Sequence, residues 1–181
     1  WMPTRHQAED YLCRHGMGYT RIGSAYQGVR ADIRYFVPLG QTLEIWDLVV
    51  ENQTSQERHL SAFSSVEFCL WDALDDSTNF QRNLNIGEVE VEGETIYHKT
   101  EYRERRDHFA FFACSDPLAG FDTQREAFLG QYRGWESPVV VEKGESGDSL
   151  RTGWSPIGAH HIKFTLSPGE KKRVIFLLGY H

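Results

Sequence analysis

The sequence predicts an all-β fold, an antiparallel β-sandwich with one short helix. Apolar and polar residues alternate with a period of two over several segments, which is the pattern of half-buried strands. Glycine, proline and other turn residues separate these segments at short spacing, and the 3.6-residue apolar spacing of a helix is scarce. The 181 residues suffice for one domain of this kind with a sizeable core.

Three strands are predicted in the first half of the chain. Residues 29–37 alternate strictly, with arginine or aspartate between apolar residues. The turn residues 38–41 lead into residues 43–50, whose apolar side chains occupy both faces, so this strand is expected to be covered on both sides. Alternation returns over residues 60–70, which are long enough for a full sandwich strand.

Two hairpins and one further strand are predicted in the second half. Residues 88–97 turn at Gly93 and alternate valine with glutamate, which indicates one face in solvent. Residues 162–166 and 174–178 flank a Ser-Pro-Gly-Glu turn and are expected to pair as a hairpin that closes the chain. Residues 108–114 form a compact apolar run typical of a strand.

The single helix is predicted near residues 123–129. Thr123 and Glu126 have the spacing of a capping box, and Gly130 stands where a helix C-terminus favours glycine. Residues 71–83 and 135–156 are long polar or glycine-rich connections. A rigid scaffold commonly carries binding sites on connections of this kind.

Composition limits the class of ligand. A net charge of −7 disfavours binding to nucleic acids and to anionic membranes over the whole molecule. The three cysteines form no zinc or disulfide pattern, no apolar stretch approaches the about 20 residues of a membrane helix, and the start lacks the order of a secretory signal. We therefore expect a cytoplasmic protein with reduced thiols, whose many aromatic residues serve the core or stack on sugars.

Several short motifs favour ordinary structural explanations. The carboxylates within residues 101–107 could be a glycosidase pair, but mixed charges of this kind more often form ion pairs. The arginines between them could bind phosphate, but the neighbouring acids would compete for the same guanidinium groups. His160 and His161 are adjacent, so on a strand they face opposite sides and no metal site is expected. The glycosylation motif at Asn52-Gln53-Thr54 is attributed to chance.

The segment from Phe68 to Asn83 is the candidate ligand-binding loop. Its tryptophan and phenylalanine offer flat apolar faces, and Asp72, Asn79, Gln81 and Arg82 offer planar donors and acceptors that match sugar hydroxyls. A loop whose polar groups merely satisfy its own turns explains these residues equally well.

Whole phrases of the sequence resemble the N-terminal β-sandwich domain of the cellobiose phosphorylase family, within the inverting glycoside phosphorylases that also include chitobiose phosphorylases. The resemblance covers nearly the whole chain. Its phrases are residues 14–20 (RHGMGYT), 35–38 (YFVP), 65–71 (SVEFCLW), 79–83 (NFQRN), 86–90 (IGEVE), 96–108 (IYHKTEYRERRDH), 120–123 (GFDT) and 178–180 (LGY).

The resemblance implies a phosphorolysis in which phosphate attacks a β-linked glucose disaccharide and gives α-glucose 1-phosphate and glucose with inversion. Phosphate is then a co-substrate, and no metal or organic cofactor is needed. In the family the single catalytic acid lies in an α/α barrel that follows the sandwich, so residues 1–181 are expected to contain no catalytic residue and to be inactive alone. Asp72 stands where the family has Asn, and Phe80 where Tyr is common.

The resemblance also implies partners. Family members are homodimers, and the sandwich helps to complete the sugar-acceptor site of the other subunit, which would place Gln81 and Arg82 in that site together with Asp72 and Asn79. Trp1 falls well inside the family's sandwich domain, so open strand edges and a tendency to aggregate are expected. Two alternatives stay open: a stand-alone carbohydrate-binding sandwich, and the same domain of a chitobiose or other β-glucan phosphorylase.

Overall fold

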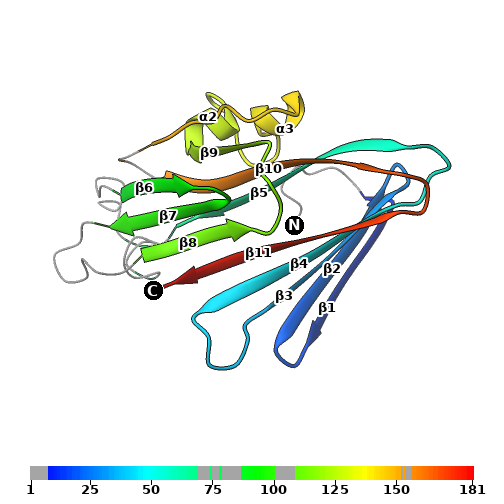
Figure 1. Cartoon of the computed structure of the whole chain (residues 1–181), viewed down its shortest axis with the longest axis horizontal. Helices are drawn as coiled ribbons and strands as arrows, with labels where there is room; N and C mark the ends of the chain where they lie inside the picture. The colour runs from blue at the N-terminus through cyan, green and yellow to red at the C-terminus, as the bar shows by residue number, and fades with distance from the viewer. Residues whose placement is uncertain are drawn as a thin grey trace.

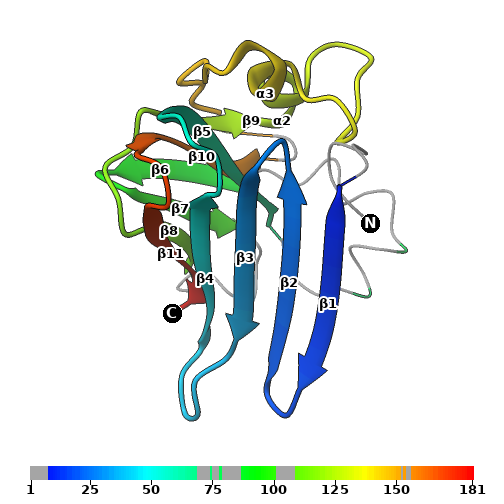
Figure 2. The same ribbon diagram turned by 90° about the vertical axis from the view of Figure 1, so that its right-hand side faces the viewer.

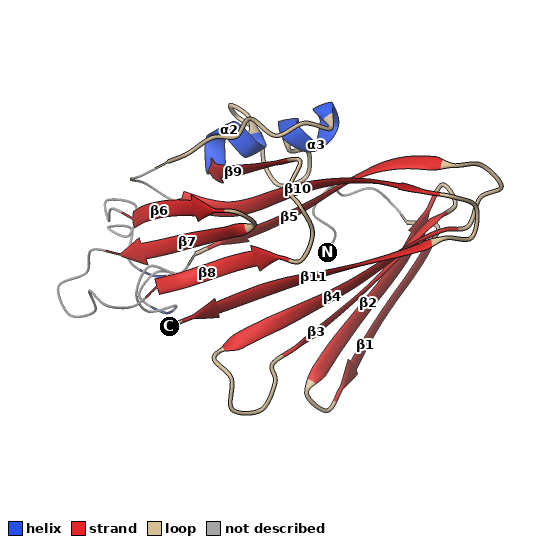
Figure 3. Ribbon diagram, in the orientation of Figure 1, coloured by secondary structure: helices blue, strands red, loops and turns tan. Residues whose placement is uncertain are grey.

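The chain forms two packed antiparallel sheets with a layer of short helices on the smaller sheet, in a computed structural model that describes residues 8–68, 74, 78, 87–100, 109–151, 153 and 156–181. Figures 1 and 3 show the helices on one side of the molecule only, above the smaller sheet. The predicted fold class, an all-β antiparallel sandwich, is confirmed.

The larger sheet has eight strands, and neighbouring strands run antiparallel throughout. In spatial order they are β1 (Asp10–Gly16), β2 (Tyr19–Tyr26), β3 (Val29–Phe36), β4 (Leu43–Asn52), β11 (Lys171–Tyr180), β8 (Phe109–Cys114), β7 (Thr95–Thr100) and β6 (Gly87–Glu92). Figure 2 shows β1 to β4 side by side, extending beyond the rest of the sandwich as two long hairpins.

The smaller sheet has three strands in the order β5 (Arg58–Glu67), β10 (Pro156–Leu166) and β9 (Gly120–Gln124). The helices α2 (Arg125–Leu129) and α3 (Val139–Lys143) pack on its outer face. As the central strand of this sheet, β10 is covered on both faces, which explains why its first seven residues are all buried.

Two apolar clusters hold the layers together. The main cluster lies between the sheets and is built around Ile96, Phe112, Ile162 and Val174, each at most 2% exposed. The second cluster lies between the small sheet and the helices and includes Phe128, Leu129, Val140, Ile157 and Ala159. Alternate residues of β10 point into the two clusters, as the period-two geometry of a strand requires.

Most predicted strands are confirmed. The alternating residues 29–37 form β3, residues 43–50 lie in β4, and the described part of residues 60–70 lies mainly in β5. The hairpin at Gly93 is β6 and β7, whose glutamates are exposed as expected. β1 and β2 had not been predicted.

The predicted closing hairpin is wrong. β10 and β11 follow one another through residues 167–170 but do not pair: β10 lies between β5 and β9, and β11 lies between β4 and β8 in the other sheet. The chain also changes sheet between β4 and β5. Both turns therefore carry the chain across the sandwich, which lets the apolar faces of consecutive strands meet across the core.

Asn52 joins the two crossings at the end of β4. Its side chain is fully buried, and its amide nitrogen donates to the carbonyl oxygens of Gln56 at 2.8 Å and Leu166 at 2.9 Å. Its amide oxygen accepts hydrogen bonds from the backbone nitrogen of Thr54 at 3.0 Å and from its hydroxyl at 2.7 Å. The Asn-Gln-Thr motif, attributed to chance above, is thus a structural element of the fold.

The helix prediction is partly wrong. The helix α2 begins at Arg125 without a side-chain cap, because the Thr123 hydroxyl donates to the Ser149 carbonyl oxygen at 3.1 Å and accepts from the Arg151 backbone nitrogen at 2.7 Å. Gly130 does end the helix, with φ of 93°. A second helix, α3, lies within residues 135–156, which had been expected to be an irregular connection.

A buried histidine sits inside the main cluster. His160 is 1% exposed, its ring stacks on Phe112 at 4.5 Å between centroids, and its Nδ1 lies 3.2 Å from the Ser64 hydroxyl. Burial lowers the pKa of His160 to about 4, because the protonated ring would lose its hydration. His161 points to the opposite side and stacks on Phe63 at 4.2 Å.

Replacing Asn52 by Asp should destabilise the fold strongly. A carboxylate would face the carbonyl oxygens that the amide nitrogen now satisfies, so we expect the free energy of unfolding to fall by about 3 kcal/mol or more. Urea unfolding measures the free energy of unfolding of the Asn52→Asp variant. The control is Gln53→Glu, which makes the same amide-to-carboxylate change at the exposed neighbouring residue. Equal stability of the two variants would contradict the role given to Asn52.

Acid should destabilise the protein through His160. Its folded pKa of about 4 lies below the unfolded value of 6.5, so the unfolded chain binds the extra proton, and stability that is complete above pH 6.5 is lost as the pH falls towards 4. We expect a loss of about 2 kcal/mol between pH 7.5 and 5 from this residue. Urea unfolding across that range should show a smaller loss in His160→Phe, and an unchanged pH dependence would refute the assignment.

Candidate functional site

The four residues predicted to contact sugar, Asp72, Asn79, Gln81 and Arg82, lie outside the described residues. The structure instead describes the residues at the two ends of the segment that carries these four residues. We call this segment the candidate loop (residues 69–86) and its two end residues the anchors. This loop begins after Phe68, the residue that follows β5, and leads into β6 at Gly87.

The first anchor is Phe68. Its side chain is 6% exposed, and its ring lies parallel to the ring of His98, with 4.7 Å between centroids and an interplanar angle of 3°. A Cβ atom at Gly158 would lie 3.0 Å from Cζ of Phe68, so the small residue on β10 leaves space for the ring. The start of the candidate loop is therefore fixed to the core.

The second anchor is Gly87. Its backbone exchanges two hydrogen bonds with Gly153, with N to O distances of 3.2 and 2.9 Å. A Cβ atom at Gly87 would lie 2.6 Å from Nε2 of His98, so no larger residue fits without displacement. Both ends of the candidate loop thus contact the same buried imidazole of His98.

Other long segments start beside these anchors. Gly153, which bonds Gly87, belongs to the predicted connection 135–156, and Thr100, which pairs with Gly87, precedes residues 101–108. Inside the candidate loop, Leu74 and Thr78 are helical, and the Thr78 hydroxyl donates to the Leu74 carbonyl oxygen at 2.8 Å. The ends of the candidate loop and the last part of the connection 135–156 therefore meet at one place on the sandwich.

A buried carboxylate shapes the predicted connection 135–156. Asp122 is 0% exposed and accepts hydrogen bonds from the Ser149 hydroxyl at 2.6 Å, the Ser149 backbone nitrogen at 3.1 Å and the Gly147 backbone nitrogen at 3.1 Å. The fully bonded carboxylate is a structural clamp rather than a catalytic acid. Neither His98 nor Asp122 was singled out from sequence, although the Ser-Gly-Asp-Ser turn at 146–149 signals a tight loop that needs acceptors.

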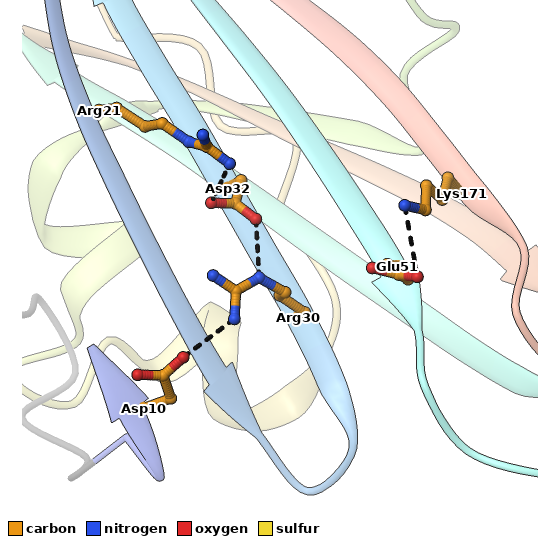
Figure 4. A network of polar contacts seen from close by, with 6 residues as sticks. All are labelled: Asp10, Arg21, Arg30, Asp32, Glu51 and Lys171. Atoms are coloured by element: carbon orange, nitrogen blue, oxygen red, sulfur yellow. Dashed lines mark hydrogen bonds and ion pairs between the residues drawn. The ribbon is translucent and has the colours of Figure 1, made fainter. Parts of the chain in front are cut away.

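The described groove lies elsewhere, on the outer face of the large sheet. It has a volume of about 670 Å³ and is lined mainly by charged residues of β2, β3, β4 and β11. Figure 4 shows part of its network, in which Arg30 joins Asp10 and Asp32, and Arg21 reaches Asp32 from β2 at 3.0 Å. Burial alone would raise the pKa of Asp32, but hydrogen bonds from Arg30 and Arg21 outweigh it and lower that pKa.

The groove offers paired charges rather than an acid catalyst. Asp47 is held by Arg173 at 2.7 Å and by Arg34 at 2.9 Å, and these contacts lower its pKa. An acid that stays ionised cannot protonate a leaving group. Within the described part of the chain, no group of three or more His, Cys, Asp or Glu side chains converges to hold a metal ion, and no helix is long and apolar enough to cross a membrane.

The chain resembles known proteins over its whole length. The model of a family described as "Glycosyl hydrolase 94, supersandwich domain" matches residues 1–181. The chain is 35% identical over 182 residues to N,N'-diacetylchitobiose phosphorylase of Vibrio proteolyticus, covering 99% of this chain and 23% of the relative. It is 31% identical over 172 residues to solabiose phosphorylase of Paenibacillus borealis, covering 94% of this chain and 22% of the relative.

A solved structure supports the same architecture. A protein described as a putative kojibiose phosphorylase from the human microbiome has a TM-score of 0.52 at 7% identity, with 90% of this chain and 17% of that chain covered. At this identity the likeness speaks for the fold alone. The chain spans about a quarter of the length of the curated relatives it matches. Because the family model covers every residue, the chain belongs to the glycosyl hydrolase 94 family as its supersandwich domain.

Proposed function

We propose that the chain is the supersandwich domain of a longer enzyme that cleaves a β-linked disaccharide with phosphate. The observation that carries the proposal is the match of all 181 residues to the family together with relatives named as disaccharide phosphorylases. The proposed protein is cytoplasmic and homodimeric, and it uses phosphate as co-substrate without a metal or organic cofactor.

The proposed reaction is a displacement at the anomeric carbon. A phosphate oxygen forms a bond to C1 while the bond between C1 and the glycosidic oxygen breaks, and a carboxylic acid donates its proton to that leaving oxygen. An inverting hydrolase needs a second carboxylate to deprotonate water, but phosphate is already anionic, so one acid is enough. That acid is proposed to lie outside these 181 residues, consistent with the bonded state of Asp122 and Asp47.

The disaccharide is the open part of the proposal. The sequence phrases resemble cellobiose phosphorylases, which favours a glucose disaccharide. Two relatives, 35% and 33% identical, are named N,N'-diacetylchitobiose phosphorylases, which favours an N-acetylglucosamine disaccharide. Cellobiose and N,N'-diacetylchitobiose are therefore the first two substrates to compare, and both fit the proposed β-linked class.

The domain's own contribution is proposed to be the candidate loop. Phe68 and Gly87 fix its two ends against His98, so the entropic cost of ordering a sugar-contacting loop is partly met before the ligand binds. Gln81 and Arg82 are proposed to reach the acceptor sugar in the active site of the partner subunit. An arginine suits this task because its rigid guanidinium can span adjacent hydroxyls.

The enzyme proposal predicts activity of the longer protein and none of the 181-residue chain. The longer protein, given either disaccharide and phosphate, should release a sugar 1-phosphate of inverted anomeric configuration, which ³¹P and ¹H NMR measure directly. The isolated chain should release none. Sugar 1-phosphate formed by the isolated chain would overturn the placement of the acid, and a longer protein inactive on both disaccharides would reject the proposed substrate class.

The loop proposal predicts a loss of acceptor affinity in Arg82→Ala of the longer protein. Loss of one charged hydrogen bond should cost about 1.5–3 kcal/mol, a roughly 10- to 150-fold rise in KM for the acceptor sugar in the synthetic direction. The KM for the sugar 1-phosphate should change less. Arg125→Ala is the matched control, because Arg125 pairs with Glu67 at 2.7 Å on its own sandwich. An unchanged acceptor KM in Arg82→Ala would make the loop a scaffold.

A further inference from the structure

The charged groove on the outer face of the large sheet has acceptors at its floor and donors at its rim. The floor consists of three carboxylates whose side chains are 11–26% exposed: Asp32, Asp47 and Glu51. The rim consists of four cations whose side chains are 49–60% exposed: Arg21, Arg34, Lys171 and Arg173. Figure 4 shows two of the floor carboxylates, Asp32 and Glu51, with their rim partners Arg21 and Lys171.

Two glycines give this groove its shape on the side of β1. Gly23 on β2 is buried, and a Cβ atom there would lie 2.6 Å from Oδ1 of Asp32, so the missing side chain leaves room for the carboxylate. Gly16 on β1 pairs with Tyr19, and a Cβ atom at Gly16 would collide with the Tyr19 ring. The ring therefore covers the glycine, and it stays 45% exposed as a flat apolar surface that lines the groove.

The charges that line the groove are nearly balanced, because each cation of the rim is paired with a carboxylate of the floor. The pairs are Arg21 with Asp32, Arg34 and Arg173 with Asp47, and Lys171 with Glu51. The pairing does not use up the hydrogen-bonding capacity of these groups. A guanidinium has five N–H donors, and among the described residues Arg21 and Arg34 each donate one hydrogen bond to their carboxylate.

Paired charges of this kind suit a neutral ligand that is rich in hydroxyl groups. A hydroxyl can donate to a carboxylate of the floor and accept from a guanidinium of the rim at the same time. An anion in the groove would meet three carboxylates, and a cation would meet four positive groups, so both are disfavoured. The volume of about 670 Å³ lies within the range of about 300–1,000 Å³ that is typical of small-molecule sites.

We infer that the groove is a second saccharide site, which binds a neutral β-linked oligosaccharide with one sugar ring on Tyr19. The inference takes the β-linked sugar class from the proposed function and rests on that proposal only in this respect. The site is separate from the candidate loop. Asp47 and Val49 point to the outer face of β4, whereas Trp46 and Leu48 point into the core that holds the loop anchor Phe68. The groove and the anchor therefore lie on opposite faces of the large sheet.

Filling the groove tests the inference. Val49 pairs with Asp32 on β3 and with Arg173 on β11, so Val49→Trp places a bulky ring in the middle of the groove without removing a charge. Titration calorimetry of the 181-residue chain with cellotetraose and with tetra-N-acetylchitotetraose should show one site for at least one of the two sugars. Val49→Trp should raise its Kd by at least about tenfold. Tyr19→Ala, a change at an exposed residue, should raise it roughly two- to tenfold, because only the stacking surface is lost.

The matched control is Ile45→Trp, which adds the same ring on the same face of β4 but outside the groove. Its Kd should equal that of the original chain, and so should that of Arg82→Ala in the candidate loop. Three outcomes would overturn the inference: no binding of either sugar, an equal Kd in Val49→Trp and Ile45→Trp, or binding of inorganic phosphate in place of the sugars. A loss of binding in Arg82→Ala alone would place the sugar on the candidate loop and also overturn it.

The longer protein gives an independent measurement of the same site. Titrated without phosphate, so that no phosphorolysis occurs, it should bind the same tetrasaccharide at a site that Val49→Trp weakens and Ile45→Trp leaves intact. A tetrasaccharide affinity that Val49→Trp leaves unchanged would contradict the inference here as well. Phosphorolysis of the disaccharides is measured separately, so a failed groove site and a failed enzyme proposal give different results.

Discussion

The fold depends on the hydrogen bonds of one buried amide, that of Asn52. Asn52 lies at two of the points where the chain changes sheet, between β4 and β5 and between β10 and β11. Each crossing leaves backbone groups that no sheet ladder satisfies, and the amide provides both a donor and an acceptor to them. The backbone of Asn52 also bonds residues 169 and 170, which lead into the neighbouring strand β11. The crossings in turn determine that β11 enters the large sheet, where it supplies Val174 and Phe176 to the core.

The buried His98 links the core to the candidate loop. Its ring packs flat on Phe68 and closes against Gly87, so the ends of the candidate loop are positioned by the same side chain. Gly153 and Thr100 extend this arrangement to the neighbouring segments. The chemistry of a family resides in the loops held by a scaffold, and a scaffold that fixes loop ends restricts where a ligand can be held. Fixed loop anchors are thus what the core would contribute to the proposed function.

The sequence was sufficient for most of the strands and turns but not for the pairing of the strands. Alternation over residues 29–37 predicted β3 because side chains on the two faces of a strand meet different surroundings. The turn at 167–170 was recognised, yet turn chemistry reverses a chain without specifying whether the next strand pairs with the last or faces it. The capping box failed because the Thr123 hydroxyl bonds Ser149 and Arg151, which are distant in sequence. For the candidate site, the sequence predicted a segment and four side chains within it. The contacts of its anchors with His98 and Gly153 could not be predicted, because tertiary structure brings these residues together.

The strand β4 is covered differently from what its sequence predicted. Its apolar residues on both faces predicted a strand covered on both sides, whereas the described structure covers only the face with Trp46, Leu48 and Val50. The other face holds Leu43 and Ile45 beside the ion-paired Asp47, so it changes from apolar to charged along one strand. A purely solvent-facing strand would not need the apolar half, and a purely buried one would not tolerate the charged half. The outer face of β4 therefore joins an apolar half to an ion-paired half, and each half has its own physical reason in the sequence.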